Sequence, residues 1–304
     1  MPCKKIFLTG ISGFIGSHLA ELLVSERFQV MALKRKSSDL WRCAAFEDQI
    51  IWVTEESMET SMLDFRPDVI LHLGWTGISH LDRANWELQM SNLPILLNLL
   101  KIGKQISVKK FLAFGSQAEY GPVEGRVSEL FQPKPDNAYA VMKLTAQKML
   151  EIFCKQHDIE WYWLRIYSVF GPREDKNWFV PMVINNLLNS VPCNLTNCEQ
   201  QYDYLYVKDL AGMILEVIRA KADSSGVYNI SSNQSKSIKS LISRINEIIN
   251  SESVIAFGAI PYRQNQSMHI EGNSELFNTT FGKYPFTDMK SALTETINFY
   301  RSSN

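Results

Sequence analysis

Three glycines at three-residue spacing follow the first apolar stretch and constrain the fold more than any other feature. They are Gly10, Gly13 and Gly16 of TGISGFIG. The short apolar run 4–10, which ends at the first of these glycines, predicts a β-strand. The leucine spacing in 17–28 predicts an amphipathic helix. Glycines between a strand and a helix allow a tight turn and let backbone amides approach a pyrophosphate at the positive end of the helix. The chain is therefore expected to begin with a dinucleotide-binding unit.

The same alternation of strand and helix continues through the first half of the chain. Further strands are expected at 29–34, 68–74, 109–116 and 161–171, and helices at 91–103 and 138–157. Repeated strand and helix units predict a parallel sheet that is covered on both faces. The predicted fold class is therefore α/β, with a doubly wound parallel sheet (Rossmann) and a second, smaller α/β domain for the substrate.

The pattern changes near residue 171, and at 304 residues a chain is long enough to divide into two domains. We expect residues 1–171 to form the NAD(P)-binding domain and 172–304 the smaller domain. The segment 202–221 is expected to return to the first domain. Within the second domain, helices are expected at 180–188 and 237–249, with a loop at 231–237.

Charge and cysteine content exclude several classes of partner. The 31 Lys and Arg residues nearly balance 32 Asp and Glu residues, so no basic field favours nucleic acid or an anionic membrane. The amino-terminal apolar run is too short for a signal peptide or a membrane span. The spacing of the five cysteines does not match a metal site, so we expect free thiols, no metal and a cytoplasmic protein. The cysteines are Cys3, Cys43, Cys154, Cys193 and Cys198.

The residues after the second strand indicate which nicotinamide cofactor is bound. Lys34 stands where an acidic residue would bind the ribose hydroxyls of NAD, and Arg35 follows it. Two cations suit the phosphate of NADP, so we predict NADPH, with NAD as the alternative. We also expect Phe14 and Ile15 to lie in the cofactor loop and help seat the helix on the sheet, and Leu73 to lie beside the cofactor.

Three polar residues form a candidate catalytic set. Tyr139 and Lys143 are four residues apart in a predicted helix and so share one face. A neighbouring ammonium favours the ionised phenol, which makes the tyrosine a better proton donor and acceptor. Ser116 ends a buried strand at the sheet edge where open α/β sheets bind ligands, so its hydroxyl can hold the substrate oxygen that Tyr139 protonates.

Six motifs in order resemble one family over nearly the whole chain. They are TGISGFIG, LHLG, FGSQAEYG, YAVMK, LRIYSVFGP and YDYLYVKDLA. Together they are similar to those of the extended short-chain dehydrogenase/reductases, in the branch of nucleotide-sugar epimerases, dehydratases and reductases. The resemblance implies Ser116, Tyr139 and Lys143 as the catalytic set, a carboxy-terminal domain that binds a nucleotide diphosphate sugar, and a homodimer.

Departures from the family pattern narrow the expected chemistry. The 4,6-dehydratases of this family carry an Asp-Glu pair after the catalytic hydroxyl, whereas this chain has Gln117 and Ala118. Reductases that also epimerise carbons 3 and 5 use a cysteine where Ala118 stands. The remaining possibilities are reduction of a C4 ketone and 4-epimerisation.

The predicted NADPH preference favours a 4-ketoreductase acting on a nucleotide-linked 4-keto-6-deoxyhexose. Sugars of this kind commonly enter surface polysaccharides. An NAD-dependent UDP-sugar 4-epimerase is the alternative, and a non-catalytic cofactor-sensing regulator is a third. Gln117, Trp75 and Arg263 are the candidate substrate-binding residues, Arg263 because its fork suits a diphosphate.

Overall fold

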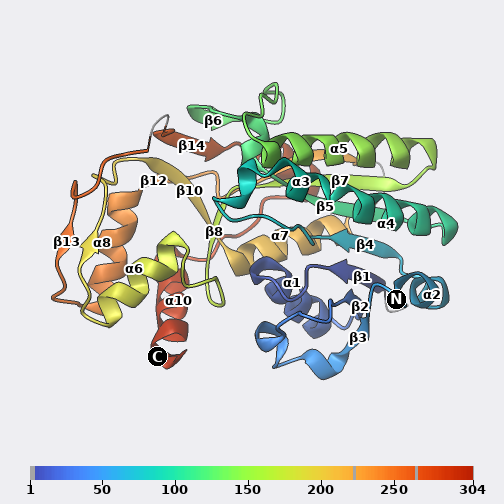
Figure 1. The fold of residues 1–304 in the computed structure, drawn as a ribbon, viewed down its shortest axis with the longest axis horizontal. Coiled ribbons are helices and arrows are strands. Elements are labelled where there is room, and N and C mark those ends of the chain that lie inside the picture. Colours follow the sequence, from blue (N-terminus) through green and yellow to red (C-terminus); the bar gives the residue numbers. More distant parts are fainter. Residues whose placement is uncertain (1–3, 222–223, 264–265, 304) are drawn as a thin grey trace.

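A seven-stranded parallel sheet forms the larger part of the protein (Figure 1). The computed structural model describes residues 4–221, 224–263 and 266–303. The strands of the sheet are β1 (Lys5–Thr9), β2 (Gln29–Leu33), β3 (Ile50–Val53), β4 (Val69–His72), β5 (Lys110–Ser116), β7 (Glu160–Ile166) and β11 (Gly226–Ile230). They lie in the order β11-β7-β5-β4-β1-β2-β3, which confirms the predicted doubly wound sheet.

Helices cover both faces of this sheet because its strands are apolar on both sides. Alternate residues point to opposite faces: Ile6 and Leu8 belong to one core, and Phe7 belongs to the other. The first core includes α1 (Phe14–Ser25) and α7 (Val207–Arg219), and the second includes α2 (Met58–Phe65), α4 (Leu93–Gln105) and α5 (Ala138–Gln156). Short elements connect them: η1 (Trp41–Cys43), η2 (Glu47–Gln49), η3 (Asp82–Ala84), α3 (Trp86–Met90) and η4 (Gln117–Tyr120).

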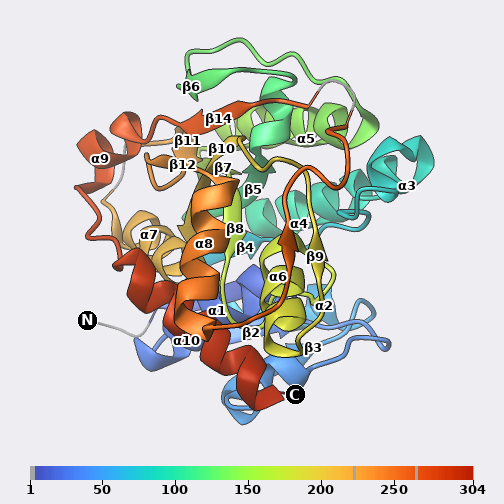
Figure 2. The ribbon, with the colours of Figure 1, turned by 90° about the vertical axis from the view of Figure 1, so that its left-hand side faces the viewer.

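A second, smaller sheet and a group of helices lie beyond the carboxyl end of the first sheet (Figure 1). The sheet contains β6 (Gly125–Val127), β8 (Ser168–Phe170), β10 (Gln201–Tyr206), β12 (Ser235–Ser237) and β14 (His269–Gly272). Three helices pack around a separate core and face the viewer in Figure 2: α6 (Phe179–Leu188), α8 (Ile238–Ile249) and α10 (Met289–Ser303). The remaining elements are β9 (Cys193–Asn194), β13 (Ile255–Ala256) and α9 (Glu275–Phe281).

The structure differs from the sequence-based expectation at three places. The stretch 161–171 is two strands, because β7 pairs with β5 and β11 while β8 pairs with β10 of the other sheet. The helix expected at 17–28 begins at Phe14 and ends at Ser25, shortly before Arg27, which adopts a left-handed φ of 63°. Part of the expected loop 231–237 pairs with β10 as β12.

Both sides of residue 171 contribute to the larger layers. Beyond it, α7 packs in the first core and β11 forms an edge of the seven-stranded sheet. The division into two domains at this residue stays a prediction. Within the described ranges, none of the helices has both the length and the apolar composition that a membrane span requires. Four cysteines are buried free thiols, and Cys3 lies outside the described residues.

Candidate active site

The glycine loop between β1 and α1 fits the pyrophosphate of a dinucleotide. Gly10 has a φ of +77°, and a Cβ atom there would lie 2.7 Å from the backbone nitrogen of Gly74. A Cβ atom on Gly16 would lie 2.1 Å from the carbonyl oxygen of Gly10, so the turn and the helix can approach each other this closely only with glycine. Gly13 is the N-cap of α1, and the first turn of that helix is uncharged. The open amides of this turn therefore suit an anion.

Phe14 and Ile15 join this loop to the smaller part of the molecule. Both pack against the core formed by α6, α8 and α10, and Ile15 also packs against the first core of the large sheet. Ile15 thus seats the helix on the sheet as expected, while Phe14 contacts the other core and the ring of His18.

Lys34 and Arg35 directly follow β2. The Lys34 ammonium lies 5.3 Å from the centroid of the Trp52 ring, and the Arg35 side chain is exposed. Leu73 is half-buried, and its N–H donates to the Thr9 carbonyl oxygen at 3.3 Å. These residues lie at the carboxyl ends of β1, β2 and β4, the edge at which open α/β sheets bind ligands.

The structure brings Ser116, Tyr139 and Lys143 together. Ser116 is the last residue of β5, and Tyr139 lies in the first turn of α5, whose N-cap Asn137 accepts a hydrogen bond from Ala140 N at 3.1 Å. The Ser116 side chain lies close enough to Tyr139 to act on the pKa of its phenol, against the rise that burial causes. Lys143 Nζ donates to the Phe114 carbonyl oxygen at 2.7 Å, which holds the lysine against the same strand.

Trp75 forms one wall of this cluster. Its ring centroid lies 3.8 Å from Lys143 Nζ, and its ring meets the Tyr139 ring edge-to-face at 6.3 Å. The indole N–H donates to Gln89 Oε1 at 2.8 Å, which fixes the ring. Burial lowers the pKa of Lys143 to about 7, although the charge of Glu119 acts against this.

Glu119 positions Ser116, although sequence reasoning did not assign it a role. The carboxylate is fully buried and accepts Ser116 N–H at 2.8 Å, Trp163 Nε1–H at 3.0 Å and Arg165 Nε–H at 2.7 Å. Ser116 Oγ in turn accepts Ala118 N–H at 3.2 Å. This is a capping box, and the Ser-x-x-Glu spacing in GSQAEYG is the signal that could have identified it.

Arg83 is the second residue that sequence reasoning missed. It lies in η3, and its guanidinium carbon is 4.8 Å from the centroid of the Tyr139 ring. Burial raises the pKa of Tyr139, while the charge of Arg83 and the hydrogen bond with Ser116 oppose that rise. The sequence held no signal for this contact, because a 56-residue separation joins two elements that only the fold brings together.

Two buried polar atoms on the residues that directly follow β5 and β7 have no hydrogen-bond partner within the described part of the chain. Among the described residues, Gln117 Oε1 and Tyr167 Oη make no hydrogen bond. Gln117 directly follows Ser116, and Tyr167 lies between β7 and β8. Buried polar groups are normally satisfied, so an unpaired acceptor beside the catalytic set suits a ligand group.

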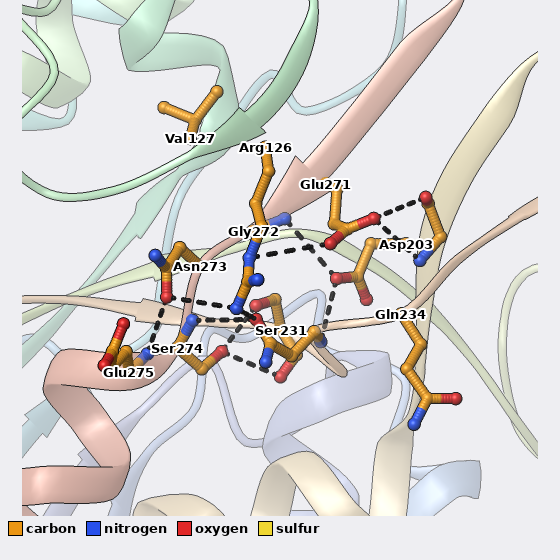
Figure 3. Close-up of polar contacts among 12 residues, drawn as sticks. Arg126, Val127, Asp203, Ser231, Gln234, Glu271, Gly272, Asn273, Ser274 and Glu275 are labelled. Atoms are coloured by element: carbon orange, nitrogen blue, oxygen red, sulfur yellow. Dashed lines mark hydrogen bonds and ion pairs between the residues drawn. The ribbon is translucent and has the colours of Figure 1, made fainter.

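A polar network joins strands of the second sheet (Figure 3). The Asp203 carboxylate accepts the backbone N–H groups of Ser232 at 2.8 Å and Asn233 at 3.0 Å. Arg126 Nε lies 3.6 Å from Glu271 Oε1, which links β6 to β14. This network joins β6, β10 and β14 to the loop that follows β11.

Arg263, the predicted diphosphate ligand, lies close to Tyr202 of β10. Its side chain is exposed in the segment before β14, where its charge opposes the rise in the pKa of Tyr202 that burial causes. Among the described residues, no contact joins Arg263 to Ser116 or Tyr139. Groups of three or more His, Cys, Asp or Glu that could hold a metal are likewise absent from the described part of the chain.

Comparison with known proteins gives one family. A model described as the NAD-dependent epimerase/dehydratase family matches residues 6–231. The chain is 26% identical over 312 residues to a CDP-abequose synthase of Salmonella typhimurium, with 97% of each chain covered. It is 24% identical over 314 residues to a GDP-6-deoxy-D-mannose reductase of Pseudomonas aeruginosa, with 98% of each covered. A solved UDP-N-acetylglucosamine 4-epimerase from Methanobrevibacter ruminantium M1 superposes with a TM-score of 0.89 at 24% identity, over 100% of both chains.

Proposed function

This chain belongs to the NAD-dependent epimerase/dehydratase family, and we propose that it reduces the C4 ketone of a nucleotide-linked 4-keto-6-deoxyhexose with NADPH. In this reaction Tyr139 gives its proton to the ketone oxygen and Ser116 holds that oxygen. The product is an alcohol, and the cofactor leaves as NADP.

The observation that carries the proposal is that, among the described residues, the carboxylate bonded to Ser116 is held in an ion pair with Arg165, which leaves Tyr139 to donate the proton. The Glu119 carboxylate accepts three donors, which are the Ser116 N–H, the Trp163 indole N–H and the Arg165 guanidinium. It therefore has no capacity to move the additional protons that a dehydration requires. A site with one proton donor suits simple hydride transfer to a carbonyl.

The choice of cofactor depends on the end of β2. NADPH, when bound at the glycine loop, supplies the hydride. Arg35 has an exposed guanidinium after this strand, and Lys34 adds a second positive charge. Together they favour a ribose phosphate, whereas a carboxylate at this place would repel it.

The substrate class rests on two relatives and on the unpaired groups of the site. One relative is named a reductase of a GDP-linked 6-deoxy sugar and the other a synthase of a CDP-linked sugar. We assign Gln117 and Trp75 to the sugar and Arg263 to the diphosphate. Gln117 supports this assignment because its Oε1 is buried and has no hydrogen-bond partner among the described residues.

To test this proposal, the purified protein is mixed with NADPH or NADH and with CDP-, GDP- or dTDP-linked 4-keto-6-deoxyhexoses. The absorbance of the reduced nicotinamide is then measured over time. NADPH is expected to be oxidised and clearly preferred. Tyr139→Phe is expected to lose about 10²–10⁴-fold in kcat while the affinity for NADPH stays unchanged. An active Phe variant would contradict the role of Tyr139.

Two other results would redirect the assignment. Interconversion of UDP-sugars without added cofactor, by protein that retains NAD, would identify a 4-epimerase, which needs the same tyrosine. A partner captured only with cofactor present, without turnover of any keto sugar, would identify a regulator. Equal use of NADH and NADPH would leave the reductase intact and remove the role of Lys34 and Arg35.

We also propose a homodimer. Leu97 on α4 and Ile152 on α5 are 36% and 55% exposed, although both are large and apolar. These helices lie side by side on one face of the large sheet (Figure 1). Light scattering after gel filtration tests this proposal, and Ile152→Glu is expected to give the monomer.

A further inference from the structure

The segment before β14 that carries Arg263 is attached to β10 through the Tyr202 side chain. The Tyr202 hydroxyl donates to the Ser267 carbonyl oxygen at 3.0 Å and accepts a hydrogen bond from the Gln266 side-chain amide. The Gln266 backbone N–H donates in turn to the Arg263 carbonyl oxygen at 3.2 Å. One phenolic hydroxyl therefore joins the strand to the backbone that carries the arginine.

Two further contacts hold the same segment in place. The Gln201 N–H donates to the Met268 carbonyl oxygen at 2.8 Å. The Glu124 carboxylate accepts the backbone N–H groups of Met268 at 2.8 Å and His269 at 2.7 Å. Because Glu124 lies eight residues after Ser116 in the chain, the segment is fixed both to β10 and to the stretch that follows Ser116.

Positive side chains lie around Tyr202. The Arg263 side chain is exposed and forms neither a hydrogen bond nor an ion pair with the described residues. Burial raises the pKa of the Tyr202 phenol, and the charge of Arg263 opposes that rise. Lys236 and Arg244 line a small hollow together with Tyr202, while the nearby Glu124 carboxylate is bound to backbone N–H groups. A guanidinium with free donors in this setting suits a phosphate group.

The place of β10 relative to Ser116 suits a substrate that reaches both. β10 belongs to the second sheet, which lies beyond the carboxyl end of the large sheet, and Ser116 is the last residue of β5 at that end (Figure 1). A sugar held at Ser116 can therefore extend its diphosphate toward β10.

We propose that Tyr202 is a positioning residue that presents Arg263 to the diphosphate of the nucleotide sugar. This inference rests on the proposed function, in which the substrate is a nucleotide-linked sugar. An arginine side chain loses rotamer freedom when it binds a ligand, and a backbone that is fixed in advance reduces the total cost of ordering. The Tyr202 hydroxyl acts through the segment and makes no contact with the substrate itself.

The first experiment measures binding without turnover. Isothermal titration calorimetry gives the dissociation constants of CDP, GDP and dTDP in the presence of saturating NADP, which fills the cofactor site. Arg263→Gln is expected to weaken the binding of the preferred diphosphate by about 10–100-fold, because charge-assisted hydrogen bonds are lost. Tyr202→Phe is expected to weaken it by about 3–10-fold, because only the anchoring hydroxyl is removed.

A double variant shows whether Tyr202 acts through Arg263. In the Arg263→Gln background, Tyr202→Phe is expected to change the dissociation constant by less than about twofold, because the side chain that the hydroxyl positions is already absent. Losses that multiply in the double variant would show that the two residues act independently and would overturn the inference. A Tyr202→Phe variant that binds the diphosphate as tightly as the wild type would overturn it as well.

Two variants serve as matched controls. Tyr228→Phe removes a hydroxyl that donates to the Ser224 carbonyl oxygen at 2.6 Å in the larger part of the molecule. Arg301→Gln removes an exposed cation on α10. Both should leave the affinity for the diphosphate unchanged, and all variants should bind NADP as the wild type does. Urea unfolding verifies that each variant is folded under the conditions of the titration.

Turnover separates this inference from the proposed function. With an active wild type, Tyr202→Phe is expected to raise the KM for the nucleotide sugar about 3–10-fold and to leave kcat within about twofold, because the diphosphate is held equally before and during the reaction. A loss of kcat at unchanged KM would overturn the inference. A wild type that binds no nucleoside diphosphate would overturn both the substrate class and the inference. Diphosphate binding that depends on Tyr202 and Arg263, in a protein that reduces no keto sugar, would overturn the reductase alone.

Discussion

Two buried carboxylates, one in each part of the molecule, are held in different ways. Glu119 lies at the end of the large sheet and is 0% exposed, and Asp203 lies in the second sheet and is 1% exposed. Glu119 forms an ion pair with Arg165, whose side chain is also buried. Asp203 accepts the backbone N–H groups of Ser232, Asn233 and, at 3.4 Å, Gly272.

The difference shows two ways of building a site from buried charge. At Glu119 a full positive charge neutralises the carboxylate, and the pair fixes Ser116 from behind. At Asp203 the Ser232 side chain and backbone amides oppose the cost of burial, and that cost raises the pKa of the carboxyl group to about 6. The second arrangement is therefore sensitive to pH.

The largest effect is expected from Glu119→Gln. The change leaves the Arg165 guanidinium buried without a counter-charge, which typically costs about 3–5 kcal/mol. Urea unfolding measures this loss. Glu247→Gln, at an exposed position of α8, is the control and should stay within about 0.5 kcal/mol of the wild type. A loss below about 1 kcal/mol would mean that the buried pair contributes little.

The second prediction concerns the pH dependence of stability that Asp203 causes. Asp203 loses its proton near its ordinary pKa of 3.8 when unfolded and near about 6 when folded. The folded state therefore binds more protons between pH 4 and 6, and its stability falls as pH rises through that window. The fall is about 3 kcal/mol at 1.36 kcal/mol per pH unit. It is measured as the difference in the free energy of unfolding between wild type and Asp203→Asn, and a difference that does not change with pH would contradict the assignment.

A smaller effect is expected where a charge pair is exposed. The Arg126 side chain is 46% exposed, and its pair with Glu271 belongs to the network around Asp203 (Figure 3). Exposed pairs contribute about 0.2–1 kcal/mol and are screened by salt. Arg126→Gln should therefore cost less than about 1 kcal/mol in urea unfolding, and the cost should shrink as sodium chloride is added. A loss as large as that of Glu119→Gln would remove the distinction between buried and exposed pairs.

The sequence predicted the part of the site that local motifs build. Gly10 and Gly16 are fixed by the turn between β1 and α1, and Tyr139 and Lys143 share one helix face, so spacing alone placed each pair. The parallel sheet followed from the repeated strand and helix units. The contact between Arg83 and Tyr139 could not be predicted, because it depends on how the loop after β4 folds over α5.

The smaller part of the molecule was harder to predict for the same reason. Its strands are short, and β12, β10, β14 and β6 come from distant segments. Asp203 has its amide partners about 30 and 70 residues away along the chain. Neither periodicity nor motif spacing reports such pairings.

The smallest change in stability is expected at Gln117, which contrasts with both carboxylates. Gln117 belongs to the same short helix as Glu119, yet its Oε1 is buried and lacks a partner among the described residues. An unpaired buried acceptor costs free energy, so Gln117→Leu should leave stability within about 1 kcal/mol of the wild type or raise it. If Gln117 binds the sugar as we propose, the KM for the nucleotide sugar should rise severalfold, while the affinity for NADPH should not change. Urea unfolding and steady-state kinetics test the two halves of this prediction. A destabilised variant with unchanged KM would show that Gln117 supports the fold, as Glu119 does, and that the unpaired oxygen has no role toward the substrate.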